Sequence, residues 1–308
     1  MNQKIITVHT PVLLEETIRY LNILPDGIYL DCTGGGGGHS REILSRLNNG
    51  KLFIMDRDEE ACDRLHKLFG DDTRVTIIND NFSNIKKYNL PKLNGLCADF
   101  GISSFHLNRE RGFSFKNEGM LDMRMDKKTD ISAYEVVNEY PEEVLANIIT
   151  KFGEEPFAKK IAFNIVKSRV IKKIKTTKEL ADIIRNAIPR KFHKKGIDPA
   201  TKTFQAIRIF VNKELESIES LLRSLEEIIS INGRAVFISF HSLEDRLVKD
   251  FLTYYSKSCI CPPNQPICTC GKKQTFKILT KKPVTPSKDE IIKNPFSRSA
   301  KLRAGERV

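Results

Sequence analysis

The chain has 308 residues, 40% of them hydrophobic, which is enough for proper cores and, from length alone, for about two domains. Its 51 basic and 39 acidic residues give a formal net charge of +12, an excess that favours a polyanionic partner such as nucleic acid. No secretory signal precedes His9 and no apolar run is long enough to cross a membrane, so a cytoplasmic protein is predicted, in which disulfides are rare.

The first predicted elements are a strand, a glycine loop and a helix. Residues 27–30 form a short apolar strand, Asp31 follows, and five consecutive glycines at 34–38 precede a helix that begins at His39. Glycine loses the most backbone entropy on ordering, so this run indicates backbone that turns sharply or lies against a ligand. A flexible linker, the alternative, would have polar flanks. The pattern is typical of the first β-loop-α turn of a nucleotide-binding α/β fold.

Three more strands are predicted over 51–55, 74–79 and 95–98, and carboxylates end two of them. Asp56 follows the first and Asp99 the last. Parallel sheets bind ligands at the carboxyl ends of their strands, and an acid about 20 positions after the glycine loop binds ribose hydroxyls in such folds. Asp56 occupies that place. Any one of these aspartates could be a helix N-cap, but Asp31, Asp56 and Asp99 at successive strand ends indicate a site.

The glycine loop also narrows the choice of ligand. A phosphate-binding P-loop needs Lys and then Ser or Thr after its glycines, whereas His39 and Ser40 follow here, and contiguous glycines do not match a spaced dinucleotide motif cleanly. S-adenosylmethionine has no phosphates, so its loop need only admit a ribose and an amino-acid tail. We therefore expect this cofactor rather than ATP or a dinucleotide.

The middle of the chain changes texture, because from about 132 to 225 apolar residues recur at helical spacing and clear strands vanish. We predict a helical insertion over 108–202 between two parts of one α/β core, 1–107 and 203–308. The insertion carries two basic runs, at 167–175 and 190–195. It is interpreted either as a clamp for structured RNA or as a helical lid that would form a homodimer.

The last strands are predicted to begin at 235–239 and to end in a basic segment. Residues 298–303 alternate as in an edge strand with basic side chains on one face. Arg298, Lys301 and Arg303 are therefore candidates for contacts with RNA phosphates. A structural role in closing the sheet is an equal alternative.

The cysteines fall into two groups. Cys32, Cys62 and Cys97 lie in core-like segments and are expected to be reduced packing residues. The others form two C-x-C pairs separated by six residues, and four thiolates this close could hold a structural Zn²⁺. The usual zinc spacing is C-x₂-C, so a redox-sensitive loop or unligated cysteines are the alternatives. The four are Cys259, Cys261, Cys268 and Cys270.

Long motifs along nearly the whole chain resemble the MraW (RsmH) family, bacterial methyltransferases that act on N4 of a cytidine in 16S rRNA. The resemblance implies a Rossmann-like class I S-adenosylmethionine-dependent methyltransferase core with a helical insertion. It also implies a substrate in the decoding region of the small ribosomal (30S) subunit. The motifs lie at 8–16, 34–39, 99–104, 111–115, 121–126, 203–208, 239–246 and 298–303.

The resemblance also implies a set of cofactor contacts. Gly37, Gly38 and His39 fall where the family's loop meets S-adenosylmethionine. Asp56 falls where the family binds the ribose, as the strand pattern also indicates, and Phe82 falls beside the adenine. Asp99 and His106 complete the set. Phe82 and His106 rest on the resemblance alone, since a core phenylalanine and a surface histidine are their ordinary interpretations.

Catalysis requires that the weakly nucleophilic N4 be held in line with the S–CH₃ bond. Asp99 is the candidate acceptor for an N4 hydrogen, although its role as a cofactor contact could exclude this one. His241 could instead accept the proton or orient the base, or it could be a capping histidine.

A target base must be exposed before it can enter the site. Phe113 is a candidate to stack on it, with a packed hinge as the alternative, and Arg111 and Arg124 are candidate RNA contacts.

Two other functions compete with the rRNA methyltransferase. A DNA amine methyltransferase would usually carry two prolines after the acid, and Asp99-Phe100-Gly101 lacks them. A non-catalytic RNA-binding assembly factor would be expected to lose the glycine loop, Asp56 or Asp99, and all are present.

Overall fold

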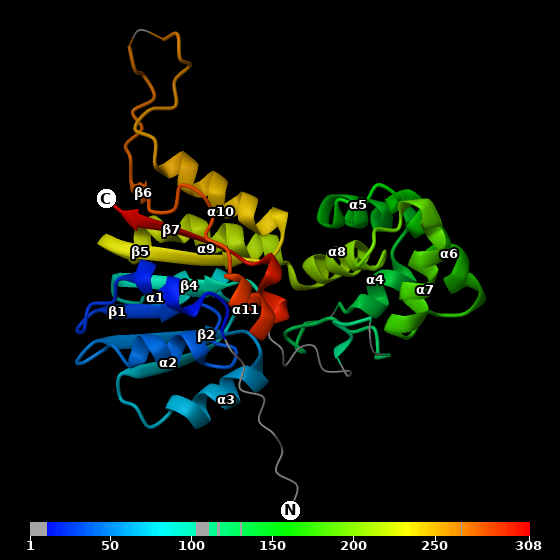
Figure 1. The fold of residues 1–308 in the computed structure, drawn as a ribbon, viewed down its shortest axis with the longest axis horizontal. Helices are drawn as coiled ribbons and strands as arrows, with labels where there is room; N and C mark the ends of the chain where they lie inside the picture. The colour runs from blue at the N-terminus through cyan, green and yellow to red at the C-terminus, as the bar shows by residue number, and fades with distance from the viewer. Residues whose placement is uncertain (1–10, 103–110, 116–117, 130, 266) are drawn as a thin grey trace, which may run out of the picture. The chain divides into compact units, whose positions relative to one another are not determined.

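The structure is a computed structural model that describes residues 11–102, 111–115, 118–129, 131–265 and 267–308. The chain divides into two compact units, one formed by residues 1–101 and 215–308 and the other by residues 102–214 (Figure 1). The second unit ends at Glu214 rather than at the expected Lys202. The reason is that helix α8 (Thr201–Asn212) packs against α5 (Glu142–Gly153) within that unit.

The first unit contains a seven-stranded sheet in the order β3-β2-β1-β4-β5-β7-β6. The five strands β3, β2, β1, β4 and β5 are parallel to one another, while β7 runs antiparallel to both β5 and β6. The strands are β1 (Ile28–Asp31), β2 (Lys51–Asp56), β3 (Val75–Asn79), β4 (Leu93–Asp99), β5 (Ile229–Ser239), β6 (Phe276–Ile278) and β7 (Lys301–Arg307).

Side chains that alternate along the central strands build a core on each face of the sheet. On β4, Leu96 and Ala98 join the core under α9, α10 and η1, while Cys97 joins the core under α1, α2 and α3. Helices cover both faces of the mostly parallel sheet, so the predicted Rossmann-like α/β core is confirmed. The helices are α1 (Leu14–Leu21), α2 (Gly38–Leu44), α3 (Glu59–Phe69), α9 (Glu214–Ile228), α10 (Ser242–Tyr255) and α11 (Lys288–Lys293), with 3₁₀ turns η1 (Phe82–Tyr88) and η4 (Pro295–Ser299).

The prediction of an edge strand at 298–303 is wrong. Arg298 lies in η4, and the strand begins at Lys301 and runs between β5 and β6. Leu302 and Ala304 are fully buried, as an interior strand requires. The short β6 forms the edge instead. The other predicted strands are confirmed, with β5 beginning six residues before its expected start at Ala235.

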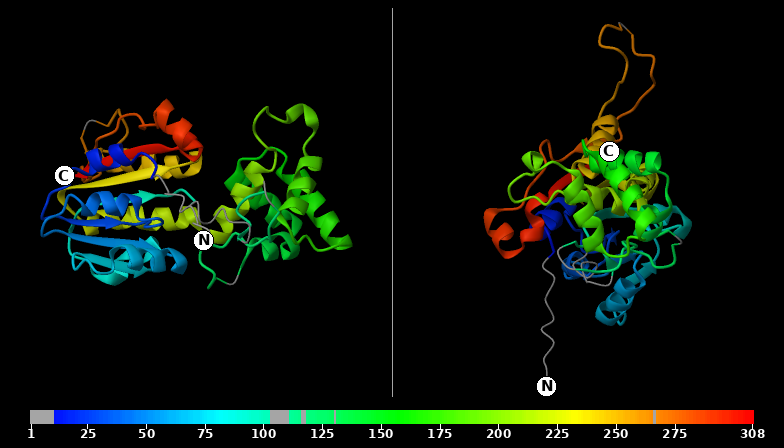
Figure 2. Two further views of the ribbon diagram at one scale, coloured as in Figure 1. Left: turned by 60° about the horizontal axis from the view of Figure 1, so that its bottom comes forward. Right: turned by 90° about the vertical axis from the view of Figure 1, so that its right-hand side faces the viewer.

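The second unit is a bundle of helices, coloured green in Figure 2. Ser132 and Thr176 begin α4 and α7 with capping boxes, in which a hydroxyl and a glutamate satisfy free backbone N–H groups reciprocally. Its remaining elements are α4 (Ala133–Glu139), α6 (Ala158–Ile171), α7 (Thr177–Ala187) and η3 (Arg190–Phe192). None of the described helices in either unit is long and apolar enough to cross a membrane.

Candidate active site

The carboxyl end of β1 is fixed by a buried aspartate. Asp31 is 1% exposed, and its two carboxylate oxygens accept hydrogen bonds from Ser40 Oγ at 2.6 Å and from the Thr33 N–H at 3.1 Å. The first hydrogen bond ties the strand end to α2 beyond the glycine loop. The loop is therefore closed by its own ends, which leaves the glycines between them to set its shape.

Glycine is favoured at the positions of this loop for different physical reasons. A Cβ at Gly34 would lie 2.6 Å from Ile54 Cγ2, so only a glycine lets the loop rest on β2. At Gly35 the φ of +50° favours glycine, but a Cβ would meet nothing closer than 3.8 Å. Gly37 and Gly38 lie against Phe69 and Pro11, each with a would-be Cβ contact at 2.8 Å. The backbone of Gly35 is thus a part of the loop that has room beside it.

Asp56 ends β2 and faces this part of the loop. Its Oδ2 accepts the Gly35 N–H at 2.8 Å, and its Oδ1 accepts the Asp58 N–H at 2.8 Å, at the start of α3. The residue predicted to bind the ribose is therefore held rigidly beside the glycine loop.

Asp99 ends β4 and is tied to the same loop. Its N–H donates to Thr33 Oγ1 at 2.8 Å, and its Oδ1 accepts the Gly101 N–H at 2.9 Å. Burial raises the pKa of the Asp99 carboxyl to about 6, against the opposing influence of His39 and the Gly101 N–H. The nearby carboxylates of Asp31 and Glu244 raise it further. A carboxyl that titrates near neutral pH at a strand end is typical of a group that handles protons.

The other predicted cofactor residues lie around these strand ends. His39 is buried, with Nε2 3.1 Å from the Val12 carbonyl oxygen, so its ring ties α2 to the segment before α1. Phe82 begins η1 just after β3, and its ring centre lies 6.0 Å from that of Phe100. His106 lies outside the described residues.

His241 caps a helix. It is the N-cap residue of α10, and its Nδ1 accepts the Glu244 N–H at 3.5 Å. The Glu244 carboxylate accepts the N–H groups of Phe240 and His241 in return, and its Oε1 lies 3.1 Å from His241 Nε2. The hydrogen bond from the Glu244 N–H to Nδ1 favours the capping interpretation, while Nε2 lies near the buried Glu244 carboxylate without a hydrogen bond to it.

The three basic candidates near the C-terminus differ in environment. Arg303 is 8% exposed and makes a bidentate ion pair with Asp245, at 2.6 Å and 3.2 Å. Lys301 Nζ lies 3.4 Å from the same carboxylate and is partly exposed, whereas Arg298 is exposed. The Arg303 guanidinium is therefore buried in its ion pair with Asp245. Arg298, which is exposed, is the candidate best placed to contact an external anion.

The candidates in the second unit are mostly packed. Arg111 and Phe113 are buried, and Arg111 donates to the Met125 carbonyl. Arg124 is held by Asp122 in a bidentate pair at 2.8 Å and 3.0 Å. These contacts favour a packed hinge over a stacking platform at Phe113. The basic residues at 190–195 are different, since Arg190, Lys191, Lys194 and Lys195 are all exposed.

Sequence reasoning missed two supporting residues, Thr33 and Glu244. Thr33 joins β4 to the glycine loop, and Glu244 both caps α10 and raises the pKa of Asp99. The spacing of His241 and Glu244 is that of a capping box, which could have revealed the second of them, although histidine is an unusual first member. Nothing in the sequence marks Thr33, because its partner lies 66 residues away.

The sequence is similar to that of known proteins along nearly its whole length. The profile of the MraW methylase family matches residues 6–308. A protein of Caldicellulosiruptor saccharolyticus named "Ribosomal RNA small subunit methyltransferase H" is 49% identical, over 97% of this chain and 99% of its own length. A protein of the same name from Clostridioides difficile is 47% identical, also over 97% of this chain and 99% of its own length. A crystal structure of an rRNA methylase from Streptococcus thermophilus gives a TM-score of 0.43 at 9% identity, covering 96% of this chain and 92% of that one. The chain belongs to the MraW methylase family.

Proposed function

We propose that this protein transfers a methyl group from S-adenosylmethionine to N4 of a cytidine in 16S rRNA, in the decoding region of the small ribosomal subunit. The RNA substrate is supported by the relatives, which are named as methyltransferases of small-subunit ribosomal RNA and align with 97% of this chain. The observation that carries the acceptor chemistry is the Asp99 carboxylate, which is held against the glycine loop and titrates near neutral pH.

The residues at the strand ends fit the cofactor. A Cβ at Gly35 would meet nothing closer than 3.8 Å, and Asp56, at the end of β2, holds the Gly35 N–H at the position where such folds bind a ribose. Phe82, which begins η1 just after β3 and is half-buried, is the residue that we assign to the adenine. We assign Gly37, Gly38 and His39 to holding the loop and its surroundings in shape, because all three pack against protein.

When bound, S-adenosylmethionine supplies a methyl group on a sulfonium that is already activated for transfer. Asp99 accepts a hydrogen bond from the N4 amino group, which favours the tetrahedral geometry in which the N4 lone pair is available. The methyl carbon leaves sulfur as it bonds to N4, and Asp99 takes the proton that N4 then loses. The products are N4-methylcytidine and S-adenosylhomocysteine. His241 is a positioning residue here, since it fixes Glu244 near Asp99.

Radiolabelled S-adenosylmethionine would test the proposal with three acceptors: unmodified 16S rRNA, 30S subunits that lack the modification, and duplex DNA. Each acceptor would be digested to nucleosides and the label identified. We expect N4-methylcytidine from RNA or from subunits, and none from DNA. Label in a different nucleoside would contradict the N4 assignment, and label in DNA would favour a DNA amine methyltransferase.

Two variants make the assay specific for the site. Asp99→Asn keeps the acceptor oxygen for Gly101 but cannot take a proton, so transfer is expected to fall by 10²–10⁴-fold, as for a lost general base. Asp56→Ala is expected to weaken cofactor binding. If Asp99→Asn weakened cofactor binding and left transfer at saturating cofactor unchanged, Asp99 would be a cofactor contact only.

A further inference from the structure

The four cysteines left aside by the proposed reaction lie in one loop of the first unit. The loop runs from the end of α10 at Tyr255 to the start of β6 at Phe276, and the Thr275 N–H closes its base on the Tyr255 carbonyl at 3.0 Å. Figure 2 (right) shows it projecting in orange from the rest of the unit. None of the described residues between 256 and 275 is buried. The loop therefore has no apolar core of its own to order it.

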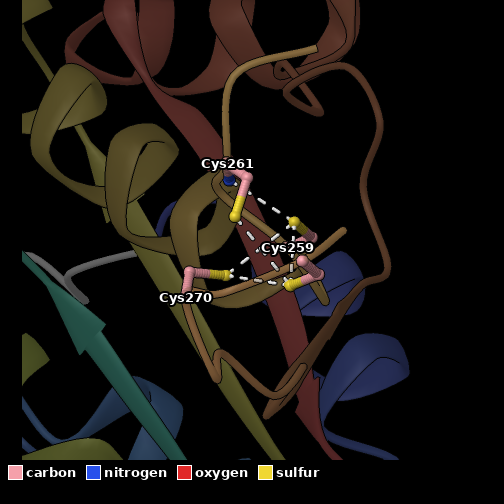
Figure 3. Close-up of side chains that lie close together, drawn as sticks. Cys259, Cys261 and Cys270 are labelled. Atoms are coloured by element: carbon pink, nitrogen blue, oxygen red, sulfur yellow. Dashed lines mark hydrogen bonds between the residues drawn. The ribbon is translucent and has the colours of Figure 1, made fainter. Parts of the chain in front are cut away.

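The four sulfur atoms nevertheless gather at one point, as Figure 3 shows for the cluster. Cys268 Sγ lies 3.4 Å from Cys259 Sγ, 3.9 Å from Cys261 Sγ and 3.5 Å from Cys270 Sγ. Cys270 Sγ lies 3.8 Å from Cys259 Sγ, and all four sulfurs are within 4.8 Å of one another. One sulfur with three near-equal neighbours is the geometry of a tetrahedron rather than of two separate pairs.

We propose that these four thiolates bind one structural Zn²⁺. Zinc binds four cysteine thiolates tetrahedrally at about 2.3 Å, which places the sulfurs about 3.8 Å apart. The observed separations cluster around this value. Two disulfides would instead pull the sulfurs into two pairs at about 2 Å, and would leave no reason for the pairs to meet.

The backbone supports a negatively charged sulfur cluster. The Cys261 N–H donates to Cys259 Sγ at 3.4 Å, and the Ile260 N–H donates to Cys270 Sγ at 3.5 Å. Both donors belong to the first C-x-C pair, and one of them reaches a sulfur of the second pair. The loop also carries Lys257, Lys272 and Lys273, whose charges offset those of four thiolates around a divalent cation.

The position of the cluster assigns it a structural role. α10 begins at the carboxyl end of β5 and runs 14 residues, about 21 Å, before the loop leaves it. The cysteines thus follow the end of α10 that is remote from Asp99 and the glycine loop. A metal there orders a coreless loop and takes no part in methyl transfer.

The full-length protein, expressed without a metal-binding tag in zinc-supplemented medium and purified without chelator, provides the test. Elemental analysis is expected to find about one zinc per chain, and X-ray absorption to show four sulfur ligands at about 2.3 Å. Replacing Zn²⁺ with Co²⁺ is expected to give the intense thiolate-to-cobalt absorption of a tetrahedral site. Removal of the metal is expected to speed tryptic cleavage at Lys257 and Lys272 at least tenfold.

Variants within the exposed loop are not expected to change the folding of the core, so a loss of zinc in them can be attributed to the loss of a ligand. Cys259→Ser and Cys270→Ser are expected to lose most of the zinc and leave thermal unfolding of the core unchanged, whereas Ser258→Ala, a matched neighbour, keeps it. The proposal is overturned if the reduced wild-type protein neither contains zinc nor takes up added Zn²⁺. It is equally overturned if zinc is present with fewer than three sulfur ligands, or if all these variants retain it.

Discussion

Asp99 is a residue at which function and stability are expected to oppose each other. Its pKa is about 6 in the folded protein against an ordinary value of 3.8, and the largest cause is burial. Folding therefore favours the protonated form. The resulting stabilisation is full at pH values below 3.8 and is lost as the pH rises through 6, by up to about 3 kcal/mol.

We predict that Asp99→Asn makes the cofactor-free protein more stable at pH 8 and little changed at pH 4, while methyl transfer falls by 10²–10⁴-fold. Asparagine keeps the hydrogen bond from Gly101 and removes the cost of burying a charge. Urea unfolding at the two pH values measures this difference. Equal stability of variant and wild type at pH 8 would show that Asp99 ionises in the folded state at no cost.

The same pKa predicts the pH dependence of the reaction. The carboxylate form accepts the N4 hydrogen, so kcat/KM for RNA should fall tenfold for each pH unit below about 6 and level off above it. The profile is measured with free 16S rRNA or 30S subunits, whichever accepts the methyl group. A flat profile from pH 5 to 8 would remove Asp99 from the proton transfer.

Arg303 is expected to act on stability and not on RNA. Burial opposes ionisation of Asp245, but the Arg303 guanidinium outweighs it and holds the pKa of that carboxyl below its ordinary value. Arg303→Ala leaves the Asp245 carboxylate with only the partly exposed Lys301 as its ion-pair partner, which costs up to roughly 3–5 kcal/mol, whereas Arg303→Met with Asp245→Leu should recover most of this loss. Urea unfolding tests both. Arg298→Ala, at an exposed site, should leave stability unchanged, and weaker RNA binding by Arg303→Ala at full stability would contradict the assignment.

At the scale of single residues, the sequence predicts which residues lie at the ends of strands. It does not predict environments that depend on contacts with residues far away in the chain. Asp56 and Asp99 could be located because each ends an apolar run, and the structure places both beside the glycine loop. The environment of Arg303 could not, because Asp245 lies 58 residues away and only the pairing of β7 beside β5 brings the two together. His241 had two interpretations until Glu244 was seen to engage its ring.

At the scale of elements, the two basic runs of the second unit look alike in sequence and differ in structure. In the first run, Arg169 donates to the Val137 carbonyl, Lys172 pairs with Glu179, and Lys173 donates to the Asn138 carbonyl. These side chains hold α6 and the turn after it to neighbouring elements. Four basic side chains are exposed in each run, but those of the second run, around η3, make no ion pair with the described residues and therefore offer the better surface for phosphates.

We predict that alanine at all four basic positions of the second run, 190, 191, 194 and 195, weakens RNA binding at least tenfold. The slope of log K against log salt should fall by about 3, because up to four phosphate contacts are lost. Cofactor affinity should not change. Titration of labelled RNA at several salt concentrations measures both quantities.

The matched control removes the same charge from scattered exposed lysines of the first unit, at Lys51, Lys67, Lys249 and Lys257. It should change RNA affinity far less than the clustered variant. Equal losses in the two variants would mean that net charge, rather than this surface, attracts the RNA.

The order of the strands in the sheet explains why the segment 298–303 was wrongly predicted to be an edge strand. Alternation alone indicated a basic edge strand at 298–303, but β6, which is only three residues long, pairs outside β7 and makes it an interior strand. A three-residue strand leaves almost no periodic signal in a sequence. The parallel strands were predictable because both faces are buried, which produces continuous apolar runs.

At the scale of the whole molecule, we expect the first unit to bind the cofactor and the second unit to bind the RNA. Asp31, Asp56, Asp99 and the glycine loop all belong to the first unit, whereas the exposed basic run at 190–195 belongs to the second. Each unit has its own buried core, so each ligand should stabilise mainly the unit that it contacts.

We therefore predict that hydrogen exchange separates the two ligands. S-adenosylmethionine should slow exchange at 33–38, 56–58 and 99–101, because binding makes opening of these backbone segments more costly. RNA alone should slow exchange around 190–195. The Asp56→Ala variant should lose the first pattern and keep the second, and the 190–195 variant should do the reverse. RNA protection confined to the first unit would show that the helical unit serves another purpose, such as dimerisation.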